Sequence, residues 1–457
     1  TYMKEKKMKK NLRKQLSIVL SCTCMASAVL TGCGKANTEA DSSDVQKEST
    51  SGKTQIAFWH SMSGANQEVL EKLVADYNAS QDTYEVVAEN QGNYDESTGK
   101  FFNMANGDGS AAIIQIGEQN LQSMVDSDMI CSVTDLIKKY NFDDSDLLDQ
   151  AVNFYTVDSN MYAMPFNSSC PVVYYNADVF KSAGYTELPT TFEELEEAAK
   201  KVAEVNTDIK PVGMFAYGYA LDQMCTNMGS YIINNKNGRD GRATEVAYKD
   251  AMTEIFNWVA DLRDDGCLQS YGTDFENTVS AFTQAEIAMF ISSSASARNI
   301  INSSDFNVGI AYLPVPKGTE AQGVYAGGGA ICVAKGLDAE VESGVMDFLK
   351  YATSAEVQAS WAGNTGYFPI SKAAYETDTL KAVYKELPQL EVAQQQLLAS
   401  KISDVTAGPL LSQLPQLRSD IATALEAVCN GGDVDEALKT AITSTNDAIA
   451  TANEGVK

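Results

Sequence analysis

The sequence predicts an α/β fold with two lobes. Short strand-like runs alternate with amphipathic helical segments, a rhythm that implies a parallel sheet covered by helices. The rhythm runs from residue 54 to 116, resumes at 171, and leaves strand-like segments at 306–313 and 329–334. About 400 residues of such chain more naturally form two domains than one. We therefore expect two α/β lobes, with a chain that crosses between them more than once.

The first lobe is predicted to begin abruptly at residue 54 with a strand over 54–59. An amphipathic helix follows, then a strand at 84–88, a helix at 96–105 and a buried strand at 112–116. The apolar face of the first helix carries Val69, Leu70, Leu73, Val74 and Tyr77.

The second lobe is predicted to begin near the strand 171–175. Thr191 and Glu194 are spaced as a capping box at the start of the next helix. Residues 246–300 read as mostly helical, and long helices follow residue 389. We assign residues 54–165 and about 306–344 to the first lobe, and residues 166–305 and about 345–457 to the second.

The N-terminal segment resembles a bacterial lipoprotein leader. Seven basic residues precede the uncharged stretch 16–30, which is too short to span a bilayer comfortably. Small residues then lead to a cysteine in Leu30-Thr31-Gly32-Cys33. An ordinary secretory leader or a transmembrane anchor is the alternative. We expect a signal peptide over 1–32, lipid on Cys33, a flexible linker over 33–53, and a protein anchored on the extracellular face of the cell membrane.

Charge and cysteine content exclude several functions. The formal net charge is −27, and removal of the leader leaves 27 basic against 60 acidic residues, or −33. Nucleic acid and anionic membrane surfaces would be repelled by such a chain. The six later cysteines are scattered and His60 is the single histidine, so we expect no metal site. We favour buried free thiols, with one disulfide pair as the alternative.

The sequence carries no signature of an enzyme. A nucleophile elbow, a phosphate-cradling loop and a histidine–carboxylate cluster are all missing. We therefore expect no catalysis and no cofactor; an extracellular hydrolase is the different-class alternative.

Short motifs dispersed along the chain carry a family resemblance. They include Phe58-Trp59-His60-Ser61-Met62, Gly92-Asn93-Tyr94, Ile114-Gln115-Ile116-Gly117-Glu118, Pro165-Phe166-Asn167-Ser168-Ser169, Thr365-Gly366-Tyr367-Phe368-Pro369-Ile370 and Pro415-Gln416-Leu417-Arg418. In this order and spacing the set resembles the family 1 extracellular solute-binding proteins that serve sn-glycerol-3-phosphate ABC transporters. Sugar-binding proteins such as the maltose-binding proteins belong to the same family.

The resemblance implies a periplasmic-binding-protein-like fold of type II, with a ligand cleft between the lobes. It also implies capture of sn-glycerol 3-phosphate or a related glycerophosphodiester for import, with ABC permease subunits as partners. An oligosaccharide-binding lipoprotein of the same fold is the alternative. We expect a monomer that closes around its ligand.

The ligand-binding residues implied by the resemblance are Tyr94, Glu118, Ser169, Ser293, Gly328, Tyr367 and Arg418. Their chemistry suits a glycerol phosphate, because a guanidinium, hydroxyl groups and an unobstructed backbone N–H bind phosphate while a carboxylate accepts from hydroxyls. Where family members tend to carry tryptophans, this chain has Phe215-Ala216-Tyr217-Gly218-Tyr219-Ala220. Tyr217 or Tyr219 is the candidate replacement, which leaves the exact ligand open.

Overall fold

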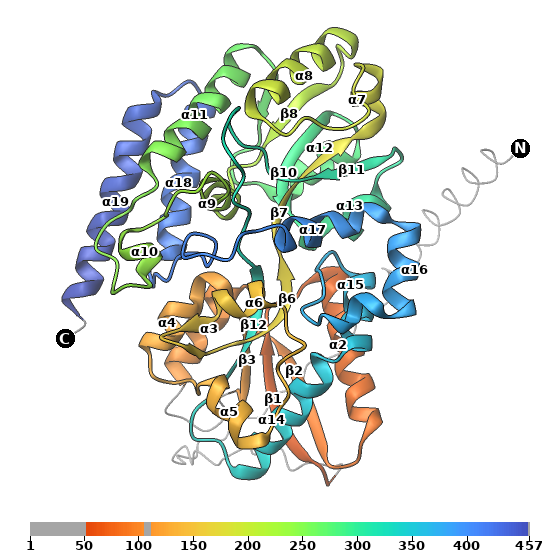
Figure 1. Cartoon of the computed structure of the whole chain (residues 1–457), viewed down its shortest axis with the longest axis vertical. Coiled ribbons are helices and arrows are strands. Elements are labelled where there is room, and N and C mark those ends of the chain that lie inside the picture. The colour runs from red at the N-terminus through yellow and green to blue at the C-terminus, as the bar shows by residue number, and fades with distance from the viewer. Residues whose placement is uncertain (1–51, 105–110, 456–457) are drawn as a thin grey trace, which may run out of the picture. The chain divides into compact units, whose positions relative to one another are not determined.

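The structure is a computed structural model that describes residues 52–104 and 111–455 (Figure 1). The predicted signal peptide, Cys33 and nearly all of the predicted linker lie outside these residues. Two five-stranded sheets and a two-stranded hairpin make up the strands. Each large sheet is the centre of one lobe, which confirms the prediction of a two-lobed α/β fold.

The first sheet has the strand order β2-β1-β3-β12-β6. Its first three strands are parallel, while β12 runs antiparallel to both of its neighbours. The strands are β1 (Thr54–His60), β2 (Tyr84–Asn90), β3 (Ile113–Gly117), β6 (Met164–Ser169) and β12 (Gly327–Val333).

Helices and a hairpin surround this first sheet. They are α2 (Gly64–Ser80), α3 (Tyr94–Met104), η1 (Glu118–Asn120), α4 (Leu121–Asp126), α5 (Val133–Tyr140), α6 (Asp149–Phe154), β4 (Thr156–Val157), β5 (Asn160–Met161), α14 (Ala339–Ala352), α15 (Ala355–Asn364), η3 (Ala373–Glu376) and α16 (Asp378–Glu386). Helix α2 buries Leu70, Leu73, Val74 and Tyr77, as its apolar spacing predicted.

The second sheet has the strand order β11-β7-β10-β8-β9. Its strands are β7 (Pro171–Asn176), β8 (Lys210–Met214), β9 (Leu268–Ser270), β10 (Ile287–Ser293) and β11 (Val308–Ala311). Strands β8, β9 and β10 are parallel, whereas β7 runs antiparallel to β10 and β11.

The helices of the second lobe follow the predicted pattern in part. They are α7 (Ala177–Ser182), α8 (Phe192–Val205), α9 (Gly218–Asn227), α10 (Asn234–Gly238), α11 (Lys249–Asp264), α12 (Phe275–Thr283), η2 (Ser294–Ser296), α13 (Ala297–Ser303), η4 (Pro388–Glu391), α17 (Val392–Leu398), α18 (Leu414–Cys429) and α19 (Val434–Glu454). The Thr191 side chain accepts from the Glu194 N–H at the start of α8, which confirms the Thr191 half of the predicted capping box. Within the described ranges, no helix is long and apolar enough to cross a membrane.

The lobe boundaries differ from the predicted ones at three points. Strand β6 lies wholly in the first sheet, although residues from 166 onward were assigned to the second lobe. Strand β11 pairs with β7 in the second sheet rather than joining the first lobe. Helices α14 and α15 pack against β1 and α2, so the first lobe extends beyond residue 345. Short apolar strands fit either sheet by pattern alone, because only their pairing partners distinguish the two.

Residues 246–300 are mostly helical, as predicted, but the prediction missed the two strands β9 and β10 in this region. Strand β10 lies within this supposedly helical region, at the centre of the second sheet. Ile287, Ala288, Met289 and Phe290 are all buried, so the strand lacks the alternation that would reveal it.

The described cysteines confirm the prediction of free thiols. The six from Cys131 to Cys429 form no disulfide, and all except the partly exposed Cys131 are buried. Burial raises the pKa of the Cys170 thiol to about 12, so this thiol stays protonated and unreactive.

The sheet edges bring the predicted site residues together. Glu118 follows the carboxyl end of β3, Ser169 ends β6, and Gly328 lies opposite Ser168 at the start of β12. In the second lobe, Tyr217 follows β8 and Ser293 ends β10. Ligands of open α/β sheets bind beyond the carboxyl ends of the parallel strands, so this topology forms a cleft.

A close helix approach positions the second-lobe side of that cleft. Gly218 begins α9, and a methyl group at this position would overlap the Arg418 backbone in α18. The missing side chain therefore lets α9 and α18 touch, which places the flanking tyrosines Tyr217 and Tyr219 beside Arg418.

We expect Gly218→Ala to lower the free energy of unfolding by roughly 1–3 kcal/mol, because the added methyl must force the two helices apart. Gly99→Ala is the matched control: that glycine lies inside α3 with open space at its Cβ position. The control should gain about 0.5–1 kcal/mol. Urea unfolding measures both. Wild-type stability for Gly218→Ala would show that α9 separates from α18 without cost.

Candidate functional site

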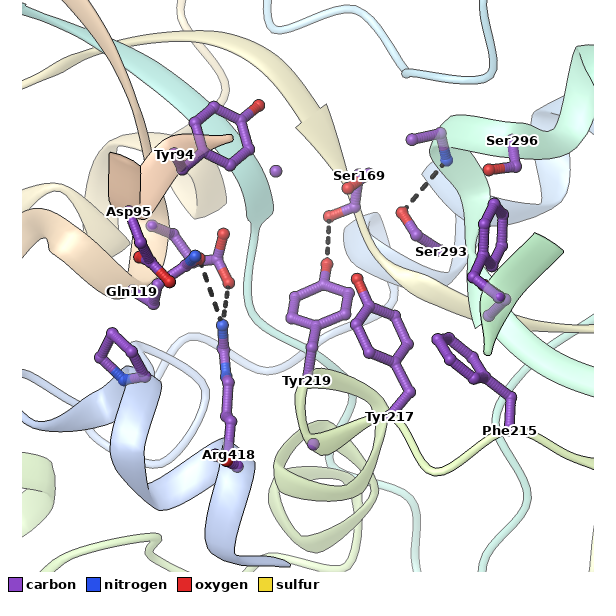
Figure 2. Close-up of a pocket in the computed structure, with 18 of the residues that line it drawn as sticks. Tyr94, Asp95, Gln119, Ser169, Phe215, Tyr217, Tyr219, Ser293, Ser296 and Arg418 are labelled. Atoms are coloured by element: carbon purple, nitrogen blue, oxygen red, sulfur yellow. Dashed lines mark hydrogen bonds and ion pairs between the residues drawn. The ribbon is translucent and has the colours of Figure 1, made fainter. Parts of the chain in front are cut away.

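A cavity of about 540 Å³ lies between the two sheet edges. It is lined by residues of both lobes, and Figure 2 shows many of them facing one another across the space. The structure brings together all nine residues that the sequence put forward: Tyr94, Glu118, Ser169, Tyr217, Tyr219, Ser293, Gly328, Tyr367 and Arg418.

Arg418 is the basic residue in the lining of this cavity. Its Nε donates to the Asp222 carboxylate at 2.7 Å, and its Nη1 donates to the Glu118 carboxylate at 2.6 Å. Its Nη2 donates to the Tyr325 hydroxyl at 2.9 Å, and that hydroxyl donates to Asp222 at 2.6 Å. Arg418 is 9% exposed, so nearly all of the solvation of its guanidinium comes from these partners.

The Arg418–Glu118 pair joins the two lobes. Glu118 belongs to η1 at the edge of the first sheet, whereas Arg418 and Asp222 belong to α18 and α9 of the second lobe. Figure 2 shows Arg418 reaching toward the segment that carries Gln119, whose side-chain oxygen lies 3.5 Å from Nη1. A second ion pair between the lobes links Arg242 to Asp126 at 3.0 Å, outside the cavity.

Burial controls the charge of the Asp222 carboxyl. Desolvation raises the pKa of Asp222 to about 6, although Arg418 and Tyr325 oppose this shift. Burial acts to lower the pKa of Arg418, but the neighbouring Asp222, Tyr325 and Glu118 outweigh it and raise this pKa, so the guanidinium is always charged. One permanent cation therefore lies between Glu118 and an acid that ionises near pH 6.

The first-lobe wall presents hydroxyl groups and a glycine. Gly328 has a φ of +88°, and a side chain there would collide with the backbone of Asn167. Its backbone thus lies next to Ser169 without a side chain between them. The Tyr367 ring stacks on Trp361, with 5.7 Å between the ring centroids and 17° between the planes.

The second-lobe wall is aromatic. Phe215 and Tyr217 stack with centroids 4.9 Å apart, and the Phe275 centroid lies 5.7 Å from that of Phe215. Tyr219 adds a ring under the Arg418 guanidinium, with 5.0 Å from Cζ to the centroid. Its hydroxyl donates to the Ser169 carbonyl at 3.2 Å (Figure 2). The two candidate replacements for tryptophan therefore lie in one aromatic wall.

Sequence reasoning missed several residues of this site. Phe215 and Phe275 line the cavity, as do Asp95 and Gln119, while Asp222 and Tyr325 lie behind Arg418. Asp222 had one signal in the sequence, because it is the single charged residue of the segment 218–227, which the structure shows as a helix buried over all ten residues. A buried carboxylate requires a partner, which would have indicated a nearby arginine.

Two α/β lobes enclose a polar and aromatic cavity, which is the usual form of a site for a small ligand. Residues 72–391 match the family model of the bacterial extracellular solute-binding proteins, and the chain belongs to this family. It is accordingly a substrate-binding component of an ABC importer.

Relatives of known function support this assignment. The chain is 30% identical over 412 residues to the sn-glycerol-3-phosphate-binding periplasmic protein UgpB of Brucella melitensis, covering 88% of this chain and 94% of that protein. It is 31% identical over 411 residues to the UgpB of Rhizobium meliloti, covering 87% and 94%.

Solved structures share the fold. UgpB from Mycobacterium tuberculosis in complex with glycerophosphocholine has a TM-score of 0.74 at 20% identity, covering 88% of this chain and all of that one. The GacH receptor of Streptomyces glaucescens, solved unliganded and with acarbose, has a TM-score of 0.71 at 19% identity, covering 87% and 97%. The type II fold expected from the resemblance is confirmed.

Because of Asp222, we expect the stability of the folded protein to depend on pH. Because its folded-state pKa is about 6 against 3.8 for an unperturbed carboxyl, the folded protein holds this proton more tightly than the unfolded chain does. That contribution is fully present below about pH 4 and is lost as the pH rises through about 6. From pH 4 to pH 7 we expect the wild type to lose up to about 3 kcal/mol of stability relative to Asp222→Asn.

Urea unfolding of both proteins at pH 4 and pH 7 measures this difference. A stability gap between them that stays constant over the range would mean that Asp222 does not change its protonation there.

Proposed function

We propose that the cavity captures sn-glycerol 3-phosphate or a related glycerophosphodiester and delivers it to the permease subunits without altering it. The observation that carries this proposal is the convergence of one guanidinium with hydroxyl donors from Ser169, Ser293, Tyr94 and Tyr367 in one cleft. Phosphate oxygens accept hydrogen bonds only, and a guanidinium with neutral donors suits them. The relatives at about 30% identity are sn-glycerol-3-phosphate-binding proteins by name, which favours the same class of ligand for this chain.

Charge balance favours the diester within this class. Arg418 faces the cavity together with the Glu118 and Asp95 carboxylates, and Glu118 already occupies one edge of the guanidinium. A phosphate monoester carries nearly two negative charges into this acidic surrounding. A phosphodiester with a cationic head group has no net charge, and the Phe215–Tyr217–Phe275 wall offers ring faces that attract a cation.

An oligosaccharide is the second candidate ligand. The aromatic wall could stack against sugar rings, and the compensated charge of Arg418 would suit a neutral molecule. The solved structures with the same fold include sugar-binding proteins. Under this alternative, Arg418 would serve to join the lobes and would not be needed for ligand charge.

Thermal shift with sn-glycerol 3-phosphate, glycerophosphocholine, inorganic phosphate and maltose distinguishes the candidates, because a ligand of the native state raises the melting temperature. We expect glycerophosphocholine to give the largest shift. Arg418→Lys keeps a cation beside Asp222 but loses the bidentate fork, so affinity for phosphate ligands should fall about tenfold.

Arg242→Lys is the matched control, because this arginine also joins the lobes but lies outside the cavity. Its ligand affinity should stay within about twofold of the wild type. Stabilisation by maltose alone, with no loss in Arg418→Lys, would assign the oligosaccharide function instead.

We also propose that the mature protein is tethered to the extracellular membrane face by lipid on Cys33, as a monomer. The support is the leader pattern ending in Leu30-Thr31-Gly32-Cys33 and the Ser- and acid-rich stretch that follows it. Acyl chains bury many CH₂ groups in the bilayer, which holds a water-soluble lobe pair at the surface.

Cys33→Ala should move the protein from the membrane fraction to the medium while leaving ligand affinity unchanged. Membrane fractionation followed by immunoblotting measures the distribution. Equal retention of the variant and the wild type would overturn the lipid anchor.

A further inference from the structure

We propose that buried amide groups behind the first-lobe wall direct the Tyr94 proton to Tyr367 and so fix Tyr367 as a hydrogen-bond donor toward the ligand, with Gln115 and Asn167 as positioning residues. The proposal deepens the proposed function and rests on it for the ligand, which must present acceptor oxygens here. Gln115 and Asn167 are fully buried and do not line the cavity.

The amides form an unbroken hydrogen-bonded chain from the backbone to the cavity. The Ser61 N–H donates to Gln115 Oε1 at 3.0 Å, and Gln115 Nε2 donates to Asn167 Oδ1 at 2.8 Å. Asn167 Nδ2 then donates to Tyr94 Oη at 2.9 Å. Strands β3 and β6 hold the two amides, so the chain crosses the sheet beneath the cleft.

The direction of these hydrogen bonds is set at the end where the Ser61 backbone N–H donates. A backbone N–H can only donate, so the Gln115 oxygen must face Ser61 and the Gln115 amino group must face Asn167. That amino group can only donate, so the Asn167 oxygen faces Gln115 and the Asn167 amino group faces Tyr94. The Tyr94 oxygen therefore accepts from behind, and its proton is left to donate elsewhere.

Tyr367 extends this series of hydrogen bonds at the cavity surface. Burial raises the pKa of Tyr367, while hydrogen bonding to Asn167 and to Tyr94 acts in the opposite direction. The Tyr367 oxygen thus receives hydrogen bonds from both partners, the Tyr94 proton is used in one of them, and the Tyr367 proton is left for the ligand. Its remaining neighbour in the described chain is the weak acceptor Met62 Sδ at 3.9 Å, which a ligand oxygen would readily replace.

Two glycines leave the space that the hydrogen-bonded side chains of Asn167 and Tyr94 need. A methyl group at Gly329 would come within 2.6 Å of Asn167 Oδ1 and 2.9 Å of Tyr94 Oη. A methyl group at Gly117 would come within 2.9 Å of the Tyr94 ring. The local backbone is therefore fitted around the amide chain and the tyrosine that it orients.

The consequence is selectivity for an acceptor group. Arg418 and Tyr367 offer protons to the cavity, so a phosphate oxygen is favoured near them and an ammonium group is disfavoured. A cationic head group would have to lie toward the aromatic wall instead, and Figure 2 shows Tyr94 across the site from Phe215 and Tyr217.

A double-mutant cycle on ligand affinity tests the proposal. Isothermal titration calorimetry uses whichever of sn-glycerol 3-phosphate, glycerophosphocholine and maltose stabilises the wild type. Tyr94→Phe and Gln115→Met should each lose about tenfold in affinity. Gln115→Met in the Tyr94→Phe background should lose less than about twofold more, because the hydroxyl that Gln115 controls is already gone. Additive losses, or wild-type affinity of Gln115→Met, would overturn the proposal.

A second variant covers the case in which Gln115→Met fails to fold. Asn167→Asp keeps the shape of the side chain, but the new carboxylate accepts from the Tyr94 hydroxyl and turns the Tyr94 proton away from Tyr367. Direct repulsion between the new charge and the ligand is present with and without Tyr94→Phe, so the cycle cancels it.

Asn227→Leu is the control for the loss of a buried amide. The Asn227 side chain lies away from the cavity and binds two backbone groups, donating to the Leu313 carbonyl and accepting from the Gly323 N–H. This variant should lose stability without a tenfold loss of ligand affinity. A tenfold loss here would show that any buried amide has this effect and would remove the support for a directed chain.

A measurement without ligand separates this proposal from the proposed function. In the ¹⁵N NMR spectrum of the free protein, the side-chain NH₂ signal of Asn167 should shift in Tyr94→Phe, because it loses its acceptor. It should stay unchanged in Ser293→Ala, a substitution elsewhere in the cavity. An unshifted Asn167 signal would overturn the amide chain whichever ligand binds, whereas a shifted signal with no response to any of the tested ligands would overturn the ligand assignment alone.

Discussion

The Arg418 guanidinium is the group on which the architecture of the cleft depends. A buried cation must be compensated where it lies, and here two carboxylates and a phenol do so at 2.6–2.9 Å. Asp222 and Tyr325 hold it from within the second lobe and behind it, while Glu118 meets it from the first lobe. The close contact of α9 with α18 at Gly218 makes this arrangement sterically possible.

The compensation has a thermodynamic effect on binding. A ligand that binds Arg418 must share the guanidinium with Glu118 or displace that carboxylate. Glu118 therefore competes with the ligand for Arg418. The apparent affinity is then reduced by the stability of the internal pair. The same pair also draws the lobes together, so it would favour the closed arrangement before a ligand arrives.

Much of this molecule could be predicted from its sequence, and the exceptions have physical causes. The strands 54–59 and 171–175 and the capped helix at Thr191 followed from local pattern, which depends on neighbours along the chain. Strand β10 and the lobe assignment of β11 did not, because burial on both faces removes alternation and pairing partners are set by tertiary structure. Seven of the nine cavity residues came from the family resemblance, and Tyr217 and Tyr219 came from the stretch where the chain departs from that family. Asp222 and the amides behind Tyr94 escaped because they act through other side chains.

The path of the chain between the sheets has one more consequence. Ser169 ends β6 in the first sheet, and Pro171 begins β7 in the second, so only Cys170 separates the two lobes at that point. When two bodies rotate about a connection, displacement grows with the length of the lever arm. Ser169 and the Tyr219 hydroxyl that binds its carbonyl therefore lie near the pivot and move little. Glu118 and Arg418 are joined through no such short link, so their separation would report most directly on how far the cleft has opened.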